Sequence, residues 1–154
     1  MKKRLYVDMD GTLVDYRTRL AGVAPEVTRQ FGDSPERIPG LYALMPPMPG
    51  ALEAFVELAG LFDTYVLSTA PWSNPSAWTD KLLWVQLHFG KEPDSPAYKR
   101  LVLSHHKDLQ RGDFLVDDRP DLHGVEAFPG EVLHFGSERF PDWASVTPYL
   151  RARA

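Results

Sequence analysis

The sequence predicts a three-layer α/β fold in which helices flank a mostly parallel sheet, with a small insertion after the first strand. Short apolar runs of strand length alternate with longer segments whose apolar residues recur at helical spacing. Strands that alternate with helices form βαβ units and hence a parallel sheet. Polar and acidic residues directly follow several of the apolar runs, and parallel sheets bind their ligands beyond these strand ends.

The expected elements follow from this alternation. Five short apolar runs are expected as strands, and three longer segments as helices. In one helix, Trp78, Leu82, Val85 and Phe89 form a stripe that we expect to face the core. The expected strands are residues 5–7, 64–67, 101–103, 114–116 and 132–135; the expected helices are residues 50–61, 75–89 and 142–151.

The chain has 154 residues, which is the size of one domain with room only for an insertion. We therefore expect a single domain over residues 1–154, with an insertion at 16–48 that is irregular and rich in proline and glycine. The formal net charge is -4, and no basic run follows the first four residues. Extended nucleic-acid binding needs clustered cations and is not expected. A small phosphorylated substrate needs only one or two local cations.

Cysteine is absent, which excludes disulfides, thiolate metal sites and cysteine nucleophiles. The basic first four residues lead directly into the first strand and its acids, so no apolar signal region follows them. No stretch approaches the roughly 20 apolar residues of a membrane span. We expect a cytoplasmic protein without a membrane partner, and the sequence leaves the oligomeric state open, a homodimer included.

The strongest local signal is Asp8-Met9-Asp10-Gly11-Thr12, directly after the first strand. Carboxylates two residues apart lie on the same side of an extended chain, and Gly11 lets the backbone turn sharply. One acid can attack a substrate while the other moves a proton. The alternative is a simple hairpin turn at Asp10-Gly11. The second acid pair downstream favours an active site over the turn.

That second pair is Asp117-Asp118, at the end of the fourth expected strand. Two adjacent carboxylates there are costly unless a cation or hydrogen bonds compensate them. Mg²⁺ takes one or two carboxylates together with phosphate oxygens and water. The alternative is a solvated strand end with Arg119 as ion-pair partner, and this motif alone does not decide between them.

Two further strand ends carry polar residues. Ser68, Thr69 and the free N–H groups near them could hold phosphate oxygens, although serine and threonine are common in loops. Lys107, facing several carboxylates, could neutralise charge on a reacting phosphorus. The neighbouring His105 and His106 lack a third ligand at suitable spacing, so we expect both to lie in a solvated loop.

Taken in order, these motifs resemble the four motifs of the haloacid dehalogenase (HAD) superfamily of phosphatases, whose sheet is Rossmann-like. The resemblance covers nearly the whole chain. Finer features resemble the 5'(3')-deoxyribonucleotidases within that superfamily. They are the Asp8-Met-Asp-Gly motif, the Thr69-x-Pro71 turn, the helix end from Trp84-Val85 to Phe89-Gly90, and Asp117-Asp-Arg-Pro-Asp121.

The resemblance implies a role for each acid. Asp8 is the expected nucleophile, and Asp10 the acid that protonates the leaving alcohol and then activates water. Asp8, the backbone carbonyl of Asp10 and Asp118 are the expected Mg²⁺ ligands, while Asp117 acts through water or Lys107. Physical reasoning agrees, because an ionised Asp8 can attack a phosphate dianion only if a cation shields it.

The resemblance also implies a substrate site. Thr69, the N–H of Ala70 and Lys107 are expected to hold the phosphate. The insertion at 16–48 is expected to form a cap over base and sugar, shorter than in the family's mammalian members. Tyr16 matches an aromatic position that the family uses near the base. Tyr42 and Trp72 are further candidates for stacking, with packing between cap and core as the alternative.

The expected function is Mg²⁺-dependent hydrolysis of deoxynucleoside monophosphates through a phosphoaspartate on Asp8. The short cap leaves open a broader phosphatase acting on other small monoesters or on nucleic-acid ends. A phospho-accepting regulatory domain would use similar residues on a similar sheet. The order of motifs disfavours it, because receiver domains carry the paired acids before the phosphorylated aspartate.

Overall fold

A five-stranded sheet with strand order β3-β2-β1-β4-β5 forms the centre of the molecule. The computed structural model describes residues 1–154, and all four strand pairs are parallel. The predicted fold class is therefore confirmed, and every expected strand lies within one residue of its observed bounds. The strands are β1 (Arg4–Val7), β2 (Asp63–Ser68), β3 (Leu101–Leu103), β4 (Phe114–Asp117) and β5 (Glu131–His134).

The alternation of side chains along the strands divides the core into two clusters. Leu5 and Val7 belong to a cluster of 28 buried residues. Helices α3 (Ala51–Leu61), α4 (Pro75–Phe89) and α5 (Trp143–Arg151) contribute to that same cluster. On the opposite face Tyr6 belongs to a cluster of 5 buried residues, which includes Val125 of the 3₁₀ helix η4 (Val125–Ala127). The layer on this second face is therefore thin and contains no long helix.

The buried face of α4 differs from the expected stripe. Leu82 is 44% exposed and Trp78 is half-buried, whereas Lys81 is only 1% exposed. Ala77, Lys81, Trp84 and Val85 occupy the inward positions, at the four-, three- and one-residue steps of a helical face. The expectation was right for Val85 and Phe89, which are buried in the core, and for the bounds of the helix. It was wrong for the first half of the helix, where Ala77 and Lys81 face inward in place of Trp78 and Leu82.

The strand order places the carboxyl ends of β1 and β4 next to each other. The chain runs outward through β2 and β3 and then returns to the other side of β1 as β4. The β1–β4 pairing continues one residue beyond β1, since the N–H of Asp8 donates to the carbonyl of Val116 at 3.0 Å. In open sheets ligands bind at such a switch point, so both acid pairs lie at the binding edge.

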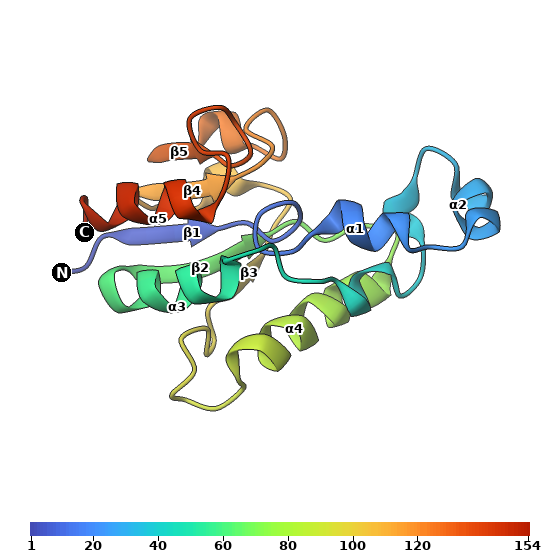
Figure 1. The fold of residues 1–154 in the computed structure, drawn as a ribbon, viewed down its shortest axis with the longest axis horizontal. Coiled ribbons are helices and arrows are strands. Elements are labelled where there is room, and N and C mark those ends of the chain that lie inside the picture. The colour runs from blue at the N-terminus through green and yellow to red at the C-terminus, as the bar shows by residue number, and fades with distance from the viewer.

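The insertion at 16–48 lies beyond that edge. It contains α1 (Tyr16–Ala21), α2 (Pro25–Phe31) and the 3₁₀ helices η1 (Pro35–Arg37) and η2 (Leu41–Leu44). Figure 1 shows α1 and α2 at one end of the molecule and both chain termini at the other. Asn74, which is 2% exposed, fixes the insertion to the core, because its Nδ2 donates to the carbonyls of Glu36 and Ile38 at 2.9 and 3.0 Å.

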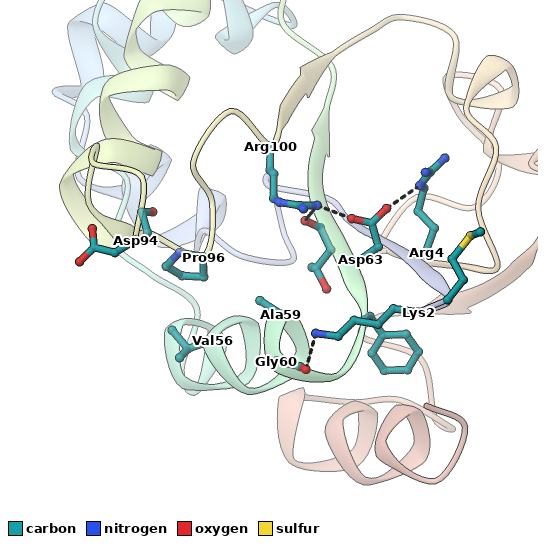
Figure 2. Close-up of a pocket in the computed structure, with 13 residues that line it drawn as sticks. Lys2, Arg4, Val56, Ala59, Gly60, Asp63, Asp94, Pro96 and Arg100 are labelled. Carbon is teal, nitrogen blue, oxygen red and sulfur yellow. Dashed lines mark hydrogen bonds and ion pairs between the residues drawn. The ribbon is translucent and has the colours of Figure 1, made fainter.

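A cavity of 620 Å³ opens at the opposite edge of the sheet, where β1 and β2 begin. Figure 2 shows Asp63 in this cavity, paired with Arg4 and Arg100. Its carboxylate is thus already satisfied, and none of the predicted site residues lines this cavity. None of the helices combines the length and the apolar character needed to cross a membrane.

Candidate active site

The loop after β1 folds back on itself directly behind Asp8. The carbonyl of Met9 accepts hydrogen bonds from the N–H groups of Thr12, Leu13 and Val14. Gly11 takes the left-handed conformation with φ of 77°, which glycine adopts without strain. The indole of Trp143 donates to the carbonyl of Thr12 at 2.9 Å and ties the loop to α5. These bonds hold Asp8 and Asp10 at the binding edge.

Lys107 joins the two acid pairs. It begins the 3₁₀ helix η3 (Lys107–Leu109) after β3, and it is 2% exposed. Its Nζ donates to Asp8 Oδ1 at 2.9 Å and to Asp117 Oδ2 at 2.6 Å. Burial alone would lower the pKa of Lys107, but the negative charges of Asp8 and Asp117 more than offset this effect. The pKa of Lys107 therefore lies above its usual value. Lys107 is therefore charged and brings both acid pairs together.

The two acids after β4 have different partners. Asp117 uses both oxygens, because Oδ1 accepts from the N–H of Arg119 at 2.8 Å and Oδ2 binds Lys107. Asp118 Oδ1 is buried and has no hydrogen-bond partner. Burial, together with the charges of Asp8 and Asp117, raises the pKa of Asp118 to about 8. A buried oxygen in this condition needs either a proton or a cation.

Asp8, Asp117 and Asp118 could share a metal ion. Each offers one carboxylate oxygen, and these atoms all lie within 4.8 Å of one another. Oxygen donors in such a cluster suit a hard cation such as Mg²⁺. A Cβ atom on Gly11 would lie 2.1 Å from Asp118 Oδ2, so only glycine leaves the Asp118 carboxylate in place.

The end of β2 supplies groups suited to a phosphate. Thr69 Oγ1 is buried without a hydrogen-bond partner, and Ala70 is fully buried beside it. A lysine ammonium carries three donors, and Lys107 uses two of them on Asp8 and Asp117. The hydroxyl of Thr69 and the third N–H of Lys107 are thus available for phosphate oxygens.

Sequence reasoning missed Lys81. Its Nζ donates to Asp10 Oδ2 at 2.6 Å and to Ser68 Oγ at 2.8 Å. A signal was present, because Lys81 falls between Ala77 and Trp84 on the inward face of α4. An isolated lysine in a helix is ordinarily read as solvent-exposed, and the expected stripe placed Leu82, not Lys81, on the inward face.

The three aromatic candidates lie in different surroundings. Tyr42 is 4% exposed, and its ring contacts Tyr16 at 6.1 Å between centroids and Lys81 Nζ at 4.8 Å. Tyr42 thus packs between insertion and core, the alternative to stacking on a base. Tyr16 is half-buried, and Trp72 is 84% exposed. These two keep an accessible face.

His105 lies in a loop, as expected, but it is partly buried rather than solvated, which corrects the expectation. It is half-buried, and its Nε2 donates to the carbonyl of Ala70 at 2.8 Å. Its ring lies within 6.0 Å of the rings of Trp72 and Trp78. His105 therefore supports the loop that carries Thr69. His106 is exposed, as expected.

Solved structures of similar proteins identify the fold. A HAD-type hydrolase of Bacillus subtilis, solved with magnesium bound, aligns with a TM-score of 0.53 at 13% identity, over 92% of this chain and 90% of that one. A HAD-like hydrolase of Xanthomonas campestris aligns with a TM-score of 0.54, also at 13% identity, over 99% of this chain and 96% of that one. The fold is therefore that of the HAD hydrolases.

The family model described as "5' nucleotidase, deoxy (Pyrimidine), cytosolic type C protein" matches residues 24–151. A predicted 5'(3')-deoxyribonucleotidase of Vibrio phage KVP40 is 47% identical over 149 residues, covering 97% of this chain and 85% of that protein. The mitochondrial 5'(3')-deoxyribonucleotidase of Mus musculus is 35% identical over 155 residues, covering 82% of this chain and 69% of that protein. The chain belongs to this nucleotidase family within the HAD superfamily, and it is a phosphatase.

Replacing Gly11 tests the metal cluster. Gly11→Ala should weaken Mg²⁺ binding by about 10- to 100-fold, because the new Cβ displaces the Asp118 carboxylate. Calorimetric titration with Mg²⁺ measures the change. Gly136→Ala is the matched control, since Gly136 has a φ of 83° but no atom within 4 Å of an added Cβ. Equal, undiminished affinity in both variants would contradict the assignment.

The raised pKa of Asp118 makes the effect of Mg²⁺ on stability depend on pH. The folded state holds the Asp118 proton more tightly than the unfolded state does, so protonation of Asp118 stabilises the folded state. This stabilisation is full below the ordinary pKa of aspartate, near 4. It is lost as the pH rises through about 8. Mg²⁺ replaces the proton and should raise Tm more at about pH 8 than at about pH 5.

Thermal unfolding with Mg²⁺ or EDTA measures this effect. With Mg²⁺ at about 100 times its dissociation constant, the gain is about 2.7 kcal/mol, or roughly 8 °C for a domain of this size. Asp118→Asn, which cannot ionise and lacks this expected ligand, should show a smaller gain in Tm at about pH 8 than the wild-type protein. The same gain in Tm at both pH values in the wild-type protein would refute the prediction.

Proposed function

We propose that this phosphatase is a Mg²⁺-dependent 5'(3')-deoxyribonucleotidase that forms a phosphoaspartate on Asp8. The observation that supports this most strongly is buried Lys107, paired with both Asp8 and Asp117 beside the free oxygen of Asp118. The names of the phage and mouse relatives support the substrate class.

Asp8, Asp118 and the backbone carbonyl of Asp10 would hold Mg²⁺, and Asp117 would act through Lys107. The free Asp118 oxygen and the three clustered carboxylates fit this assignment. When bound, the ion withdraws charge from the phosphate and shields Asp8 from it. The charges also support a bound cation, because the four acids of the site face only two lysine ammonium groups.

In the first step the phosphate lies against Thr69, the N–H of Ala70 and Lys107. A carboxylate oxygen of Asp8 attacks phosphorus, and the bond from phosphorus to the ester oxygen breaks. Asp10 gives its proton to that oxygen, so the deoxynucleoside leaves as a neutral alcohol. Burial of Asp10 raises its pKa, with Lys81 opposing the shift, which favours the protonated form that this step needs.

In the second step the phosphate leaves Asp8. Asp10, now ionised, takes a proton from a water molecule, and the oxygen of that water attacks phosphorus. The bond between phosphorus and the Asp8 oxygen breaks and releases inorganic phosphate. Asp8 returns to its ionised form and Asp10 to its protonated form, so the cycle closes.

The insertion at 16–48 would act as the cap over the nucleoside. Tyr16 opens α1 directly after the catalytic loop, and Trp72 follows the phosphate-binding turn, so both lie where base and sugar would emerge from the site. We assign stacking to these two residues. Tyr42 instead holds the cap to the core, because its ring is covered by Tyr16 and Lys81.

Phosphate release from a substrate panel tests this proposal. The panel contains 5'- and 3'-deoxynucleotides, ribonucleotides, sugar phosphates and 5'-phosphorylated oligonucleotides, each with Mg²⁺ and with EDTA. We expect Mg²⁺-dependent turnover that favours deoxynucleotides. Asp8→Asn, which keeps the size of the side chain but removes the nucleophile, should lose at least about 1,000-fold in kcat. Asp63→Asn, at the far edge of the sheet, is the matched control.

Each other outcome changes a different part of the proposal. Even turnover across the panel would keep the mechanism and replace the substrate with a broad set of monoesters. Preference for the oligonucleotides would assign the enzyme to nucleic-acid ends. A stable phosphoaspartate without turnover would indicate a phospho-accepting regulatory domain and overturn the proposal.

A further inference from the structure

Lys81 is a buried cation that the reaction steps above do not use. It reaches the site from α4, 71 residues along the chain from Asp10, and it is 1% exposed. A buried ammonium group without partners would be strongly destabilising. Asp10 Oδ2 and Ser68 Oγ compensate it at 2.6 and 2.8 Å, and the face of Tyr42 lies 4.8 Å from Nζ.

We propose that Lys81 is a positioning residue that holds Asp10 in the orientation needed for proton transfer. The inference rests on the proposed function of Asp10. Lys81 anchors one carboxylate oxygen, Oδ2, while Oδ1 is buried and has no hydrogen-bond partner. The two oxygens thus have separate tasks: Oδ2 fixes the carboxyl group, and Oδ1 carries the proton.

The fixed oxygen matters because a carboxyl group can rotate about its Cβ–Cγ bond. That torsion is broad for aspartate, so an unanchored Asp10 would sample many directions. A general acid must lie within hydrogen-bond reach of the oxygen that it protonates. A single strong contact to Oδ2 removes most of this freedom before the substrate arrives, which is the advantage of preorganised geometry.

Lys81 also connects Asp10 to the phosphate site and to the insertion. Ser68 Oγ accepts from Lys81 and donates to the carbonyl of Thr69 at 3.1 Å. The ring of Tyr42 packs over the same ammonium group. A displacement of either segment therefore reaches Asp10 through Lys81, so cap, phosphate loop and general acid share one buried cation.

The first test separates proton transfer from the other steps. Lys81→Met keeps most of the apolar stem and removes the charge. On a deoxynucleotide, whose leaving alcohol needs a proton, kcat should fall by about 100-fold or more with KM nearly unchanged. On p-nitrophenyl phosphate, whose leaving group needs no proton, the first-turnover release of nitrophenolate should fall by less than about 5-fold.

The second test restores the charge. Because the chain contains no cysteine, Lys81→Cys can be alkylated at that one position in denaturant and refolded. 2-Bromoethylamine creates a lysine analogue, and iodoacetamide creates a neutral side chain. We expect the amine to recover most of kcat on the deoxynucleotide and the amide to recover little. Wild-type protein taken through the same treatment, and the exposed-site variant Lys91→Met, are the controls.

The outcomes separate this inference from the proposed function. If the wild-type protein releases no phosphate from deoxynucleotides, the proposed function fails. Suppose instead that the wild type turns over but the rate of Lys81→Met falls equally on the deoxynucleotide and on p-nitrophenyl phosphate, or that the amide restores kcat as well as the amine. Lys81 is then only structural, and the inference fails. Circular dichroism and Tm confirm that each refolded protein is native, and the alkylated pair decides the question if Lys81→Met does not fold.

Discussion

The rest of the site depends on the pairing of buried lysines with carboxylates at one edge of the sheet. The chain buries four charged side chains, namely Asp8, Lys81, Lys107 and Asp117, and all four lie at this site. Asp10 and Asp118 add two further acids beside them. Like charges at such spacing repel strongly in a low dielectric. Lys107 and Lys81 offset part of this repulsion, and the proposed Mg²⁺ would offset more of it.

The fold makes this concentration of charge possible. Parallel pairing of β1 with β4 sets the two acid pairs side by side, and Gly11 admits the Asp118 carboxylate where any other residue would collide with it. The two lysines arrive from different directions: Lys107 from the segment after β3, and Lys81 from the inward face of α4. Asp8 and Asp10 are thus held by lysines that are distant in sequence, whereas Asp117 is held by a lysine ten residues before it.

Much of this arrangement could be predicted from the sequence, because its causes are local. Each strand is a short apolar run, and Asp8 and Asp117 follow such runs directly, so their meeting at one edge follows from parallel pairing. The family motifs added Thr69, Lys107 and the expected roles of the acids. The bounds of α3, α4 and α5 were also readable from apolar spacing and from their prolines and glycines.

The remaining features depend on long-range packing. The rotation of α4 is set by contacts of Trp84 with Met45 of the insertion and of Phe89 with Phe55, so a one-residue error in the predicted face hid Lys81. Tyr42 and His105 were misplaced or left open for the same reason, since their partners come from distant segments. The division between Asp117 and Asp118 depends on which oxygens already have donors, which only coordinates reveal.

The most direct measurement identifies the carboxylate that carries the phosphate. Enzyme quenched during turnover of a deoxynucleotide is treated with borohydride, which reduces an aspartyl phosphate to homoserine, and the peptides are sequenced by mass spectrometry. The account predicts homoserine at position 8, only when substrate and Mg²⁺ are both present, and none at positions 10, 117 or 118. Homoserine at one of those three positions, or an enzyme that turns over with position 8 unreduced at every quench time, would contradict it.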